Sequence, residues 1–426
     1  MKKILLALVL LISLSGVYAQ RTVTLWQCYD SAATSTPLAH EGVLYSKMSA
    51  LRDRNLSSAY LPTLDLNGSF VYNSDIPDMS ALLGSLPLPP GSVPSIPHEQ
   101  YRATFDVSQV IWDGGVTRSA RAVEKVIREL NMKQNEADIY RLREQINNYY
   151  FSVLIISMQM DVTELMITEL DARLKEAESG VNNGVIQAVS LDMLLAEKVK
   201  ALQSLTEMQY RHKALLYDLG QISGMGDLNG VTLELPENMP IYDSIVYNPD
   251  LHIFDVRRKQ LEVSEDLLKN QRMPKAFGFA QLGYGNPPGS NFFSENPDTY
   301  YSVGVGLKWN IFDWNKNSNE RKTLTIQQQL IDIRKSATEE TLERVLAVKK
   351  AEIESLREVS KSDDTLISLR KKIVQTAESQ MKNGTITATQ YLTELNGEKQ
   401  AVINAGLRRI NIARAEAEYI NLTGTK

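Results

Sequence analysis

The sequence contains one cysteine, Cys28, in 426 residues. A single cysteine cannot form a disulfide within the chain, so stability must come from packing or from association. Histidine is also scarce: the four residues, His40, His98, His212 and His252, lack metal-ligand spacing. We find no P-loop and no nucleophile–base pair with a supporting context. The sequence therefore predicts no cofactor, no metal site and no catalytic site.

Proline is missing from two long tracts, 98–235 and 298–426. All fifteen prolines lie at or before Pro97, or between Pro236 and Pro297. Because proline costs ~3 kcal/mol inside a helix, its absence over such lengths permits very long helices.

Beyond the N-terminal segment, long apolar runs are lacking. The nearest candidate, Tyr149 to Ile156, is far too short to span a membrane as a helix. Charge of one sign is lacking too. The 46 Lys and Arg residues stand against 51 Asp and Glu, a mildly acidic balance that does not favour a nucleic-acid partner.

The N-terminus has the pattern of a secretory signal. Lys2 and Lys3 precede the apolar run Ile4 to Ile12, and Val17-Tyr18-Ala19 supplies small residues at an A-x-A-like cleavage site. We expect removal after Ala19. No cysteine follows that point directly, which argues against a lipid anchor on the mature N-terminus.

The two proline-free tracts are copies of each other at an offset of 200 residues. Seven of the twelve positions 177–188 recur at 377–388. Further matches at the same offset are Ile111 with Ile311, Asp113 with Asp313 and Arg121 with Arg321. We interpret this as an internal duplication of about half the chain.

Apolar residues within each copy follow a heptad pattern, which predicts helices that wind around partner helices as coiled coils. The two rows at the 200-residue offset are Ile146, Val153, Met160, Ile167, Leu174 and Val181, and Leu346, Ile353, Ser360, Ile367, Val374 and Met381. A soluble coiled coil would show the same periodicity. The predicted long helices cover 115–183 and 316–383.

Each long helix is expected to end at an Asn-Gly pair, Asn183-Gly184 or Asn383-Gly384, because glycine adopts the left-handed conformation that ends helices. Return helices then follow at 188–222 and 387–422, so both copies form helical hairpins with a tight tip. Two further helices are predicted at 38–61 and 249–272.

Four segments instead alternate with period two, with apolar residues on one face and polar residues or glycine on the other. They lie at 64–73, 101–111, 276–285 and 301–311. Val303-Gly304-Val305-Gly306 is part of the last one and is not a nucleotide-binding loop. Length, alternation and aromatic ends are typical of transmembrane β-strands. A soluble, half-buried sheet would also alternate.

The strands pair as two hairpins whose Pro-rich loops, 74–99 and 286–299, suit an external face. Four strands cannot close a barrel, and unpaired edges cannot face lipid. Closure therefore demands other copies of the chain: two would give eight strands, and three would give twelve, enough for a lumen. Three is the preferred count.

The order of these elements resembles the TolC-like outer-membrane efflux proteins over essentially the whole mature chain. The residues that carry the resemblance are Tyr60-Leu61-Pro62, Ile111-Trp112-Asp113-Gly114-Gly115 and the two Asn-Gly tips. The resemblance implies a mixed, mainly α fold, in which a homotrimer forms a twelve-helix periplasmic α-barrel and a 12-strand transmembrane β-barrel. It also implies docking on a periplasmic adaptor that is coupled to an inner-membrane pump.

The resemblance further implies that residues around the tip glycines contact the adaptor. Here these are Asn183, Gly184, Val185, Ile186, Asn383, Gly384, Thr385 and Ile386. Family members carry acidic residues at the periplasmic aperture; this chain has Gln390 and Thr393 there, with Glu394 adjacent. A strong acidic ring is therefore not expected.

We expect a passive outer-membrane duct of an efflux or type I secretion system, in contact with outer-membrane lipid and without enzymatic activity. A periplasmic adaptor normally has one hairpin and no lipid-facing strands, and a soluble scaffold lacks the paired alternating segments. The predicted segments are a signal peptide 1–19, a helical segment 20–63, a β-hairpin 64–112, a helical hairpin 113–222 (tip 183–186), a linker 223–248, a helix 249–273, a β-hairpin 274–312 and a helical hairpin 313–426 (tip 383–386).

Overall fold

The computed structural model describes residues 21–77, 96–185, 187–237, 239, 247–291, 294 and 296–424. The predicted signal peptide lies outside the described residues. The chain forms two compact units: unit 1 comprises Met1–Gly42, Lys133–His252 and Ser336–Lys426, and unit 2 comprises Val43–Met132 and Ile253–Lys335. The division into successive sequence segments remains a prediction.

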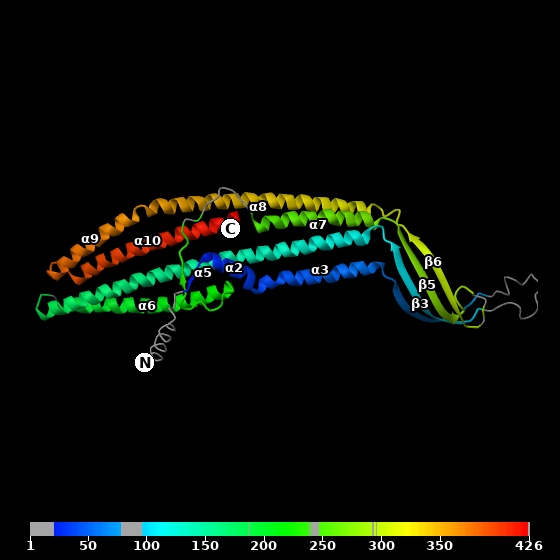
Figure 1. The fold of residues 1–426 in the computed structure, drawn as a ribbon, viewed down its shortest axis with the longest axis horizontal. Helices are drawn as coiled ribbons and strands as arrows, with labels where there is room; N and C mark the ends of the chain where they lie inside the picture. The colour runs from blue at the N-terminus through cyan, green and yellow to red at the C-terminus, as the bar shows by residue number, and fades with distance from the viewer. Residues whose placement is uncertain are drawn as a thin grey trace, which may run out of the picture. The chain divides into compact units, whose positions relative to one another are not determined.

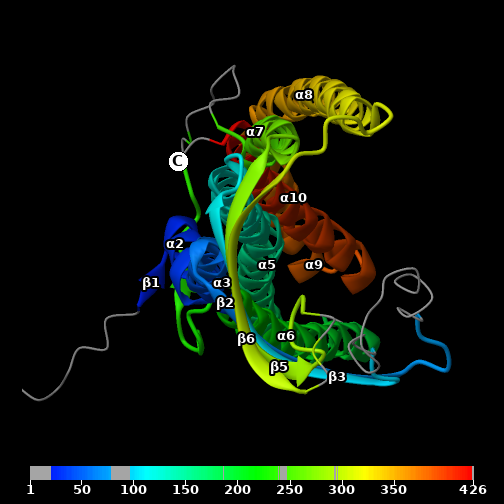
Figure 2. The ribbon, with the colours of Figure 1, turned by 90° about the vertical axis from the view of Figure 1, so that its right-hand side faces the viewer.

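Unit 2 contains a four-stranded antiparallel sheet of strand order β2-β3-β5-β6. Figure 2 shows that the sheet is strongly curved. The strands are β2 (Thr63–Tyr72), β3 (Glu99–Trp112), β5 (Lys275–Asn286) and β6 (Asp298–Lys308). All four predicted strands are present, the first three within two residues of their predicted bounds. Neighbouring strands pair in the register that the alternation requires, except for an irregularity between Val110 and Trp112.

The last strand begins and ends three residues earlier than the alternation predicted. The pattern continued to Ile311, but β6 ends at Lys308. The indole N–H of Trp309 donates to the carbonyl oxygen of Arg272 (3.1 Å), and the Arg272 guanidinium donates to the carbonyl of Ile311 (3.4 Å). These contacts with the residue that follows helix α7 replace the strand hydrogen bonds, so the prediction for residues 309–311 is wrong.

The helices of unit 2 adjoin this sheet in the chain. They are α3 (Glu41–Ser57), α7 (Pro249–Gln271) and the first parts of α5 (Val116–Asn182) and α8 (Lys316–Ser360). Helix α3 is preceded by the 3₁₀ turn η1 (Pro37–His40) and followed by the 3₁₀ turn η2 (Ser58–Tyr60). The predicted helices 38–61 and 249–272 are thus confirmed, the first with 3₁₀ ends.

Unit 1 consists mainly of two antiparallel helical hairpins, α5–α6 and α9–α10, which Figure 1 shows as paired ribbons. The new elements are β1 (Thr22–Val23), α2 (Leu25–Ser35), α6 (Ala188–Ile222), β4 (Thr232–Leu233), α9 (Asp363–Lys382) and α10 (Ala388–Thr423). The short strands β1 and β4 pair in parallel, and sequence patterns did not indicate them. A core that includes Leu25, Tyr150, Leu219 and Ile420 joins α2, α5, α6 and α10.

The second long helix is not continuous, contrary to the prediction for 316–383. Helix α8 ends at Ser360 and α9 begins at Asp363. At the break, the hydroxyls of Ser360 and Ser362 donate to main-chain carbonyls three residues earlier (2.8 and 2.9 Å), which competes with the helical pattern. Asp363, 9% exposed, forms an ion pair with Arg408 (2.9 Å) that holds the restart of the helix against α10.

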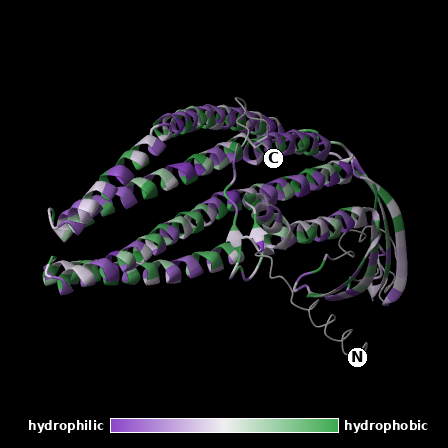
Figure 3. Ribbon diagram, turned by 60° about the vertical axis from the view of Figure 1, so that its left-hand side comes forward, coloured by the Kyte–Doolittle hydropathy of each residue, from purple (hydrophilic) through white to green (hydrophobic). Residues whose placement is uncertain are grey.

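By length and composition, α5 could cross a membrane, because it contains an 18-residue window with a mean hydropathy of 1.4. By this measure the prediction that no helix could span is wrong, since it counted only uninterrupted apolar residues. Length and composition alone do not place α5 in a membrane. Its 67 residues far exceed the ~20 that a span requires, and its Ile146, Tyr150 and Phe151 are fully buried in the unit 1 core. Figure 3 shows polar and apolar residues interspersed along the long helices.

Candidate functional site: the helical tips and the open sheet

Both helical hairpins turn through the same hydrogen-bonded loop. Gly184 and Gly384 have φ values of +70° and +69°. In each loop the glycine amide donates to the carbonyl three residues earlier (3.0 Å), and the next amide donates to the carbonyl five residues earlier (2.9 Å). This is the Schellman motif, in which a left-handed glycine lets the last helical carbonyls be satisfied. The duplication seen in the sequence is therefore a duplication of backbone geometry.

The predicted docking residues lie in these two loops. Asn183, Gly184 and Val185 form the first, with Val185 57% exposed, whereas Ile186 lies outside the described residues. The second loop contains Asn383, Gly384, Thr385 and Ile386. Its Thr385 hydroxyl donates to the Gln380 carbonyl (2.8 Å), so the second turn has one more hydrogen bond.

The return helices begin differently. Thr387 is the N-cap of α10 and forms a capping box with Gln390. The Thr387 hydroxyl accepts from the backbone N–H of Gln390 (3.3 Å), and the side-chain oxygen of Gln390 accepts from the backbone N–H of Thr387 (3.0 Å). At the start of α6 the equivalent residue, Gln187, makes no capping hydrogen bond with its side chain. Thus, of the two return helices, only α10 has the backbone N–H groups of its N-cap and third residue satisfied by a capping box.

Behind the loops, the two hairpins pack on a shared apolar cluster, the tip core. Its buried members come from all four helices: Leu170, Ala177, Leu194, Val374, Ala377, Met381, Ala388, Tyr391 and Leu395. Ile386 packs against this cluster. The tip core therefore fixes the two loops relative to each other within unit 1.

A four-residue ion-pair network lies beside the tip core. Arg173 Nη1 is 2.6 Å from Glu176 Oε2 and 2.6 Å from Glu378 Oε1, and Lys382 Nζ is 3.2 Å and 3.0 Å from the same two carboxylates. Each cation thus binds one acid from α5 and one from α9. Partial burial opposes ionisation of Glu176, but hydrogen bonds from Lys382 and Arg173 outweigh it and hold its pKa below the usual value.

The three predicted aperture residues all lie on α10. Gln390 is engaged in the capping box, the Thr393 hydroxyl donates to the Thr389 carbonyl (2.9 Å), and Glu394 accepts from Arg370 (3.4 Å). Gln390 and Glu394 share a surface groove of about 450 Å³ with Ile386, between α9 and α10. The groove brings one predicted docking residue together with two predicted aperture residues.

The sheet has one apolar face. In a single row across its four strands, Leu66 lies opposite Phe105, Phe105 opposite Leu282 and Leu282 opposite Tyr301. The side chains on this face are exposed, with Tyr301 at 81% and Val305 at 82%. Strands β2 and β6 are the two edges and have one hydrogen-bonding side unpaired within the sheet.

The strand-to-helix junction is also duplicated. Asp113 accepts hydrogen bonds from the amides of Gly115 (2.8 Å) and Thr117 (2.6 Å) and from the Tyr60 hydroxyl (2.8 Å). Partial burial disfavours the carboxylate, but these donors prevail and lower the pKa of Asp113 to about 2. Asp313 caps α8 in the same way, by accepting from the Asn317 amide (3.0 Å).

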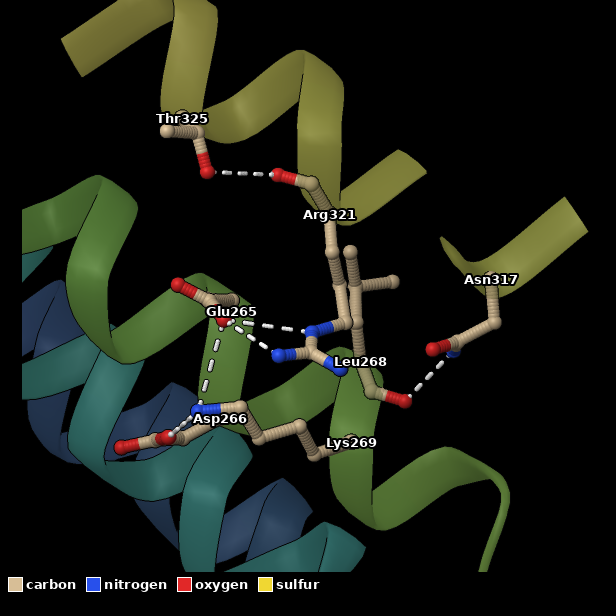
Figure 4. Close-up of polar contacts among 7 residues, drawn as sticks. All are labelled: Glu265, Asp266, Leu268, Lys269, Asn317, Arg321 and Thr325. Atoms are coloured by element: carbon tan, nitrogen blue, oxygen red, sulfur yellow. Dashed lines mark hydrogen bonds and ion pairs between the residues drawn. The ribbon is translucent and has the colours of Figure 1, made fainter. Parts of the chain in front are cut away.

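One turn further on, each long helix binds the shorter helix before it through an arginine. Arg121 donates two hydrogen bonds to Asp53 on α3 (2.6 and 2.9 Å), and Arg321 donates two to Glu265 on α7 (3.1 and 2.8 Å). Figure 4 shows Arg321 and Lys269 converging on Glu265. The 200-residue match between Arg121 and Arg321 therefore marks a shared structural contact.

Sequence reasoning missed the ion-pair network and the capping box. The pairs Arg173–Glu176 and Glu378–Lys382 have the i,i+3 and i,i+4 spacing that brings side chains together on a helix. Thr387-x-x-Gln390 has the spacing of a capping box. The bonds between the two hairpins had no local signal, because they depend on how the hairpins pack.

No protein-family model matches the chain, and no curated protein sequence is significantly similar to it. Solved structures do match over 94% of the chain. They include the outer-membrane protein VceC of Vibrio cholerae (14% identity, 96% of that chain, TM-score 0.66), the outer-membrane channel CmeC of Campylobacter jejuni (12%, 85%, 0.66) and the open state of the MtrE outer-membrane channel of Neisseria gonorrhoeae (14%, 89%, 0.63). CmeC and MtrE are described as outer-membrane channels. With its long paired helices and its four-stranded sheet, the chain has the TolC-like fold of outer-membrane efflux channels.

Proposed function

We propose that this chain is one protomer of a homotrimeric outer-membrane duct that serves as the exit channel of an efflux or type I secretion system. The single observation that carries the proposal is the open sheet: four strands with two unpaired edges, β2 and β6, and an exposed apolar face. Such a sheet is unfavourable in an isolated protein in water, because the backbone groups of its two edge strands lack strand partners and its apolar face is exposed to solvent.

Sharing the sheet between copies resolves both problems. In an antiparallel sheet that alternates regularly, β6 of one copy is antiparallel to β2 of the next, so three copies close a barrel of twelve strands. The apolar face then faces lipid, and the polar face lines a lumen. The TolC-like fold favours three copies over two.

Aromatic side chains at the sheet ends support a position in the outer membrane. Trp112, Trp309 and Trp314 are 46%, 55% and 84% exposed near the ends that lead into the helices, and Tyr72 and Tyr301 are exposed near the loop ends. Aromatic girdles of this kind mark the two membrane–water interfaces of a transmembrane barrel.

In this proposal the helices extend into the periplasm, and the two tip loops dock a periplasmic adaptor coupled to an inner-membrane pump. The docking residues are Asn183, Gly184, Val185, Ile186, Asn383, Gly384, Thr385 and Ile386, and Gln390, Thr393 and Glu394 border the aperture. Since Gln390 is held in a cap and Glu394 is paired with Arg370, we propose a weakly charged aperture. Conduction is passive, and the pump supplies the energy.

Engineered disulfides across the copy-to-copy edge test the proposal. Leu66→Cys on β2 is combined in turn with Tyr301→Cys, Val303→Cys or Val305→Cys on β6, which covers neighbouring registers. The native thiol interferes little, because Cys28 is buried and its pKa is raised to about 12. Oxidation of outer-membrane fractions should convert at least one pair into a covalent trimer on a denaturing gel.

The matched control is Leu66→Cys with Phe105→Cys, which lie opposite each other within one chain and should give only a cross-linked monomer. A folded protein in which no β2–β6 pair yields a species larger than the monomer would contradict the shared barrel.

A further inference from the structure

The polar face of the sheet carries a lysine pair that the duct itself does not require. Lys275 at the start of β5 lies directly opposite Lys308 at the end of β6. Side chains directly opposite each other point to the same face, and two like charges there are mutually destabilising. Among the described residues neither ammonium forms an ion pair, whereas Lys259, Lys269 and Lys335 of the same unit do.

Next to the lysines, the same face is aromatic. Phe277 and Phe279 lie two and four residues after Lys275 on β5, so their side chains share its face of the sheet. Their cross-strand partners on β6 are Gly306 and Gly304. The rings lie so close over these glycines that a side-chain carbon at either position would collide with them, and the ring centroids are 6.4 Å apart. Phe279 is 42% exposed. The two glycines therefore let the rings form a smooth apolar strip.

Beyond the rings, the face becomes polar. Gln281 donates to Asp106 (2.6 Å), whose carboxylate also accepts from Asn67 (2.6 Å) and from Thr104 (2.9 Å). Asp106 thus accepts from three neutral donors on its own sheet and forms no ion pair with either lysine. The order along the face is cationic pair, aromatic strip, hydrogen-bonded carboxylate.

We infer that this face forms a binding site for amphiphilic organic anions, in which Lys275 and Lys308 hold the anionic group and Phe277 and Phe279 hold an apolar or aromatic body. The inference rests on the proposed function, because the barrel must close for the polar face to line a lumen. Three copies then give a ring of six ammonium groups. An anion between the lysines relieves their repulsion, and the rings contribute apolar contact that inorganic anions do not use.

The inference is tested by channel block in planar lipid bilayers, with 1-naphthalenesulfonate added to either side in turn. The neutral analogue 1-naphthalenemethanol tests whether the charge is needed. In the wild-type protein the sulfonate should block conductance and the alcohol should not. In Lys275→Gln/Lys308→Gln the half-blocking concentration should rise about tenfold, since two charge-assisted contacts are lost. In Lys275→Arg/Lys308→Arg it should stay within about twofold, because the charge is kept.

A single exchange, Lys308→Gln, covers the case in which the double variant does not assemble, because this exposed side chain ends an edge strand. It should raise the half-blocking concentration by about threefold. Channels that conduct normally but show the same block in wild-type and Gln variants would overturn the inference and leave the duct intact. A wild-type protein that inserts and yet never conducts would overturn the duct, and the inference with it.

Discussion

The two helical hairpins of unit 1 descend from one repeated sequence, yet they bury different residues. Both share the Schellman loop, and Ala177 and Ala377 are both buried in the tip core. About two turns into the return helices the faces diverge. Helix α6 buries Leu194 completely and leaves Leu195 49% exposed, whereas α10 buries Leu395 completely. The position that matches Leu194 is Glu394, which pairs with Arg370.

This difference shows that the two copies have kept the same turns, whereas the residues that pack around the turns have diverged. Arg173, Glu176 and Lys382 of the ion-pair network have Ile373, Thr376 and Asn182 at the matching positions. Contacts between two unlike surfaces require such divergence. The hairpins have become a complementary pair, and the following changes test how far that complementarity goes.

The largest effect is expected at Leu195 and Leu395, two leucines at matching positions of which only the second is buried. Leu395→Ala should lower the free energy of unfolding by about 2–5 kcal/mol, because it leaves a cavity in the tip core. Leu195→Ala removes the same atoms from an exposed position and should cost less than about 0.5 kcal/mol in the dissociated protomer. Chemical denaturation followed by circular dichroism compares them, and equal losses would show that the two faces are equivalent after all.

The tip glycines should instead respond alike. Gly184→Ala and Gly384→Ala should each cost about 1–2 kcal/mol locally, because both positions have positive φ. Among the described residues, no atom lies within 4 Å of an added Cβ at Gly184, and the only one near Gly384 is a carbonyl oxygen at 3.4 Å, so strain rather than collision sets the cost. Amide hydrogen exchange at the loops measures it. A loss at only one tip would mean that the turns are not equivalent.

The ion-pair network should contribute a smaller, pH-dependent amount. Arg173→Gln should cost about 1 kcal/mol, because Arg173 is the cation shared by Glu176 and Glu378. The folded-state pKa of Glu176 is depressed, so its contribution is fully present above its unfolded pKa of about 4.3 and is lost as pH falls through the folded value.

Unfolding measured between about pH 7 and pH 3 should therefore show the wild type converging on Arg173→Gln as the pH falls. Ile373→Gln, at the matching position of the other hairpin, is the control and should show no such convergence. A constant difference between wild type and Arg173→Gln across this range would mean that the pairs do not stabilise the tips.

Exchange of the helix caps should give effects no larger than the loss of Arg173. Thr387→Ala should cost about 1 kcal/mol by removing the capping box of α10, and Gln187→Ser should gain about 0.5 kcal/mol by giving α6 a side-chain cap. Thermal unfolding of the two variants should shift in opposite directions. Shifts of the same sign would show that the caps do not explain the difference between the tips.

The sequence predicted the elements well because their signals are local. Alternation located all four strands, and proline placement with Asn-Gly pairs located both hairpins and their turns. The end of β6 was missed because Arg272 withdraws Trp309 and Ile311 from the strand. The break at Ser360–Asp363 was missed because a heptad row tolerates a serine without revealing that it will bond to the main chain.

The packing of the site could not be predicted in the same way. The predicted return helices 188–222 and 387–422 contain Leu194, Leu195 and Leu395, but the sequence does not show which neighbour each of these side chains faces. Gln390 was predicted to border the aperture, and its part in the capping box of α10 was not predicted. The tip residues themselves were found from the two Asn-Gly pairs, and their role as docking residues remains a proposal.

The copy number of the assembled protein tests the shared barrel most directly. Native mass spectrometry of protein extracted with detergent from outer-membrane fractions should give the mass of three chains, with no stable smaller species. A well-ordered single chain, soluble without detergent and with edge strands β2 and β6 protected from hydrogen exchange, would contradict the account.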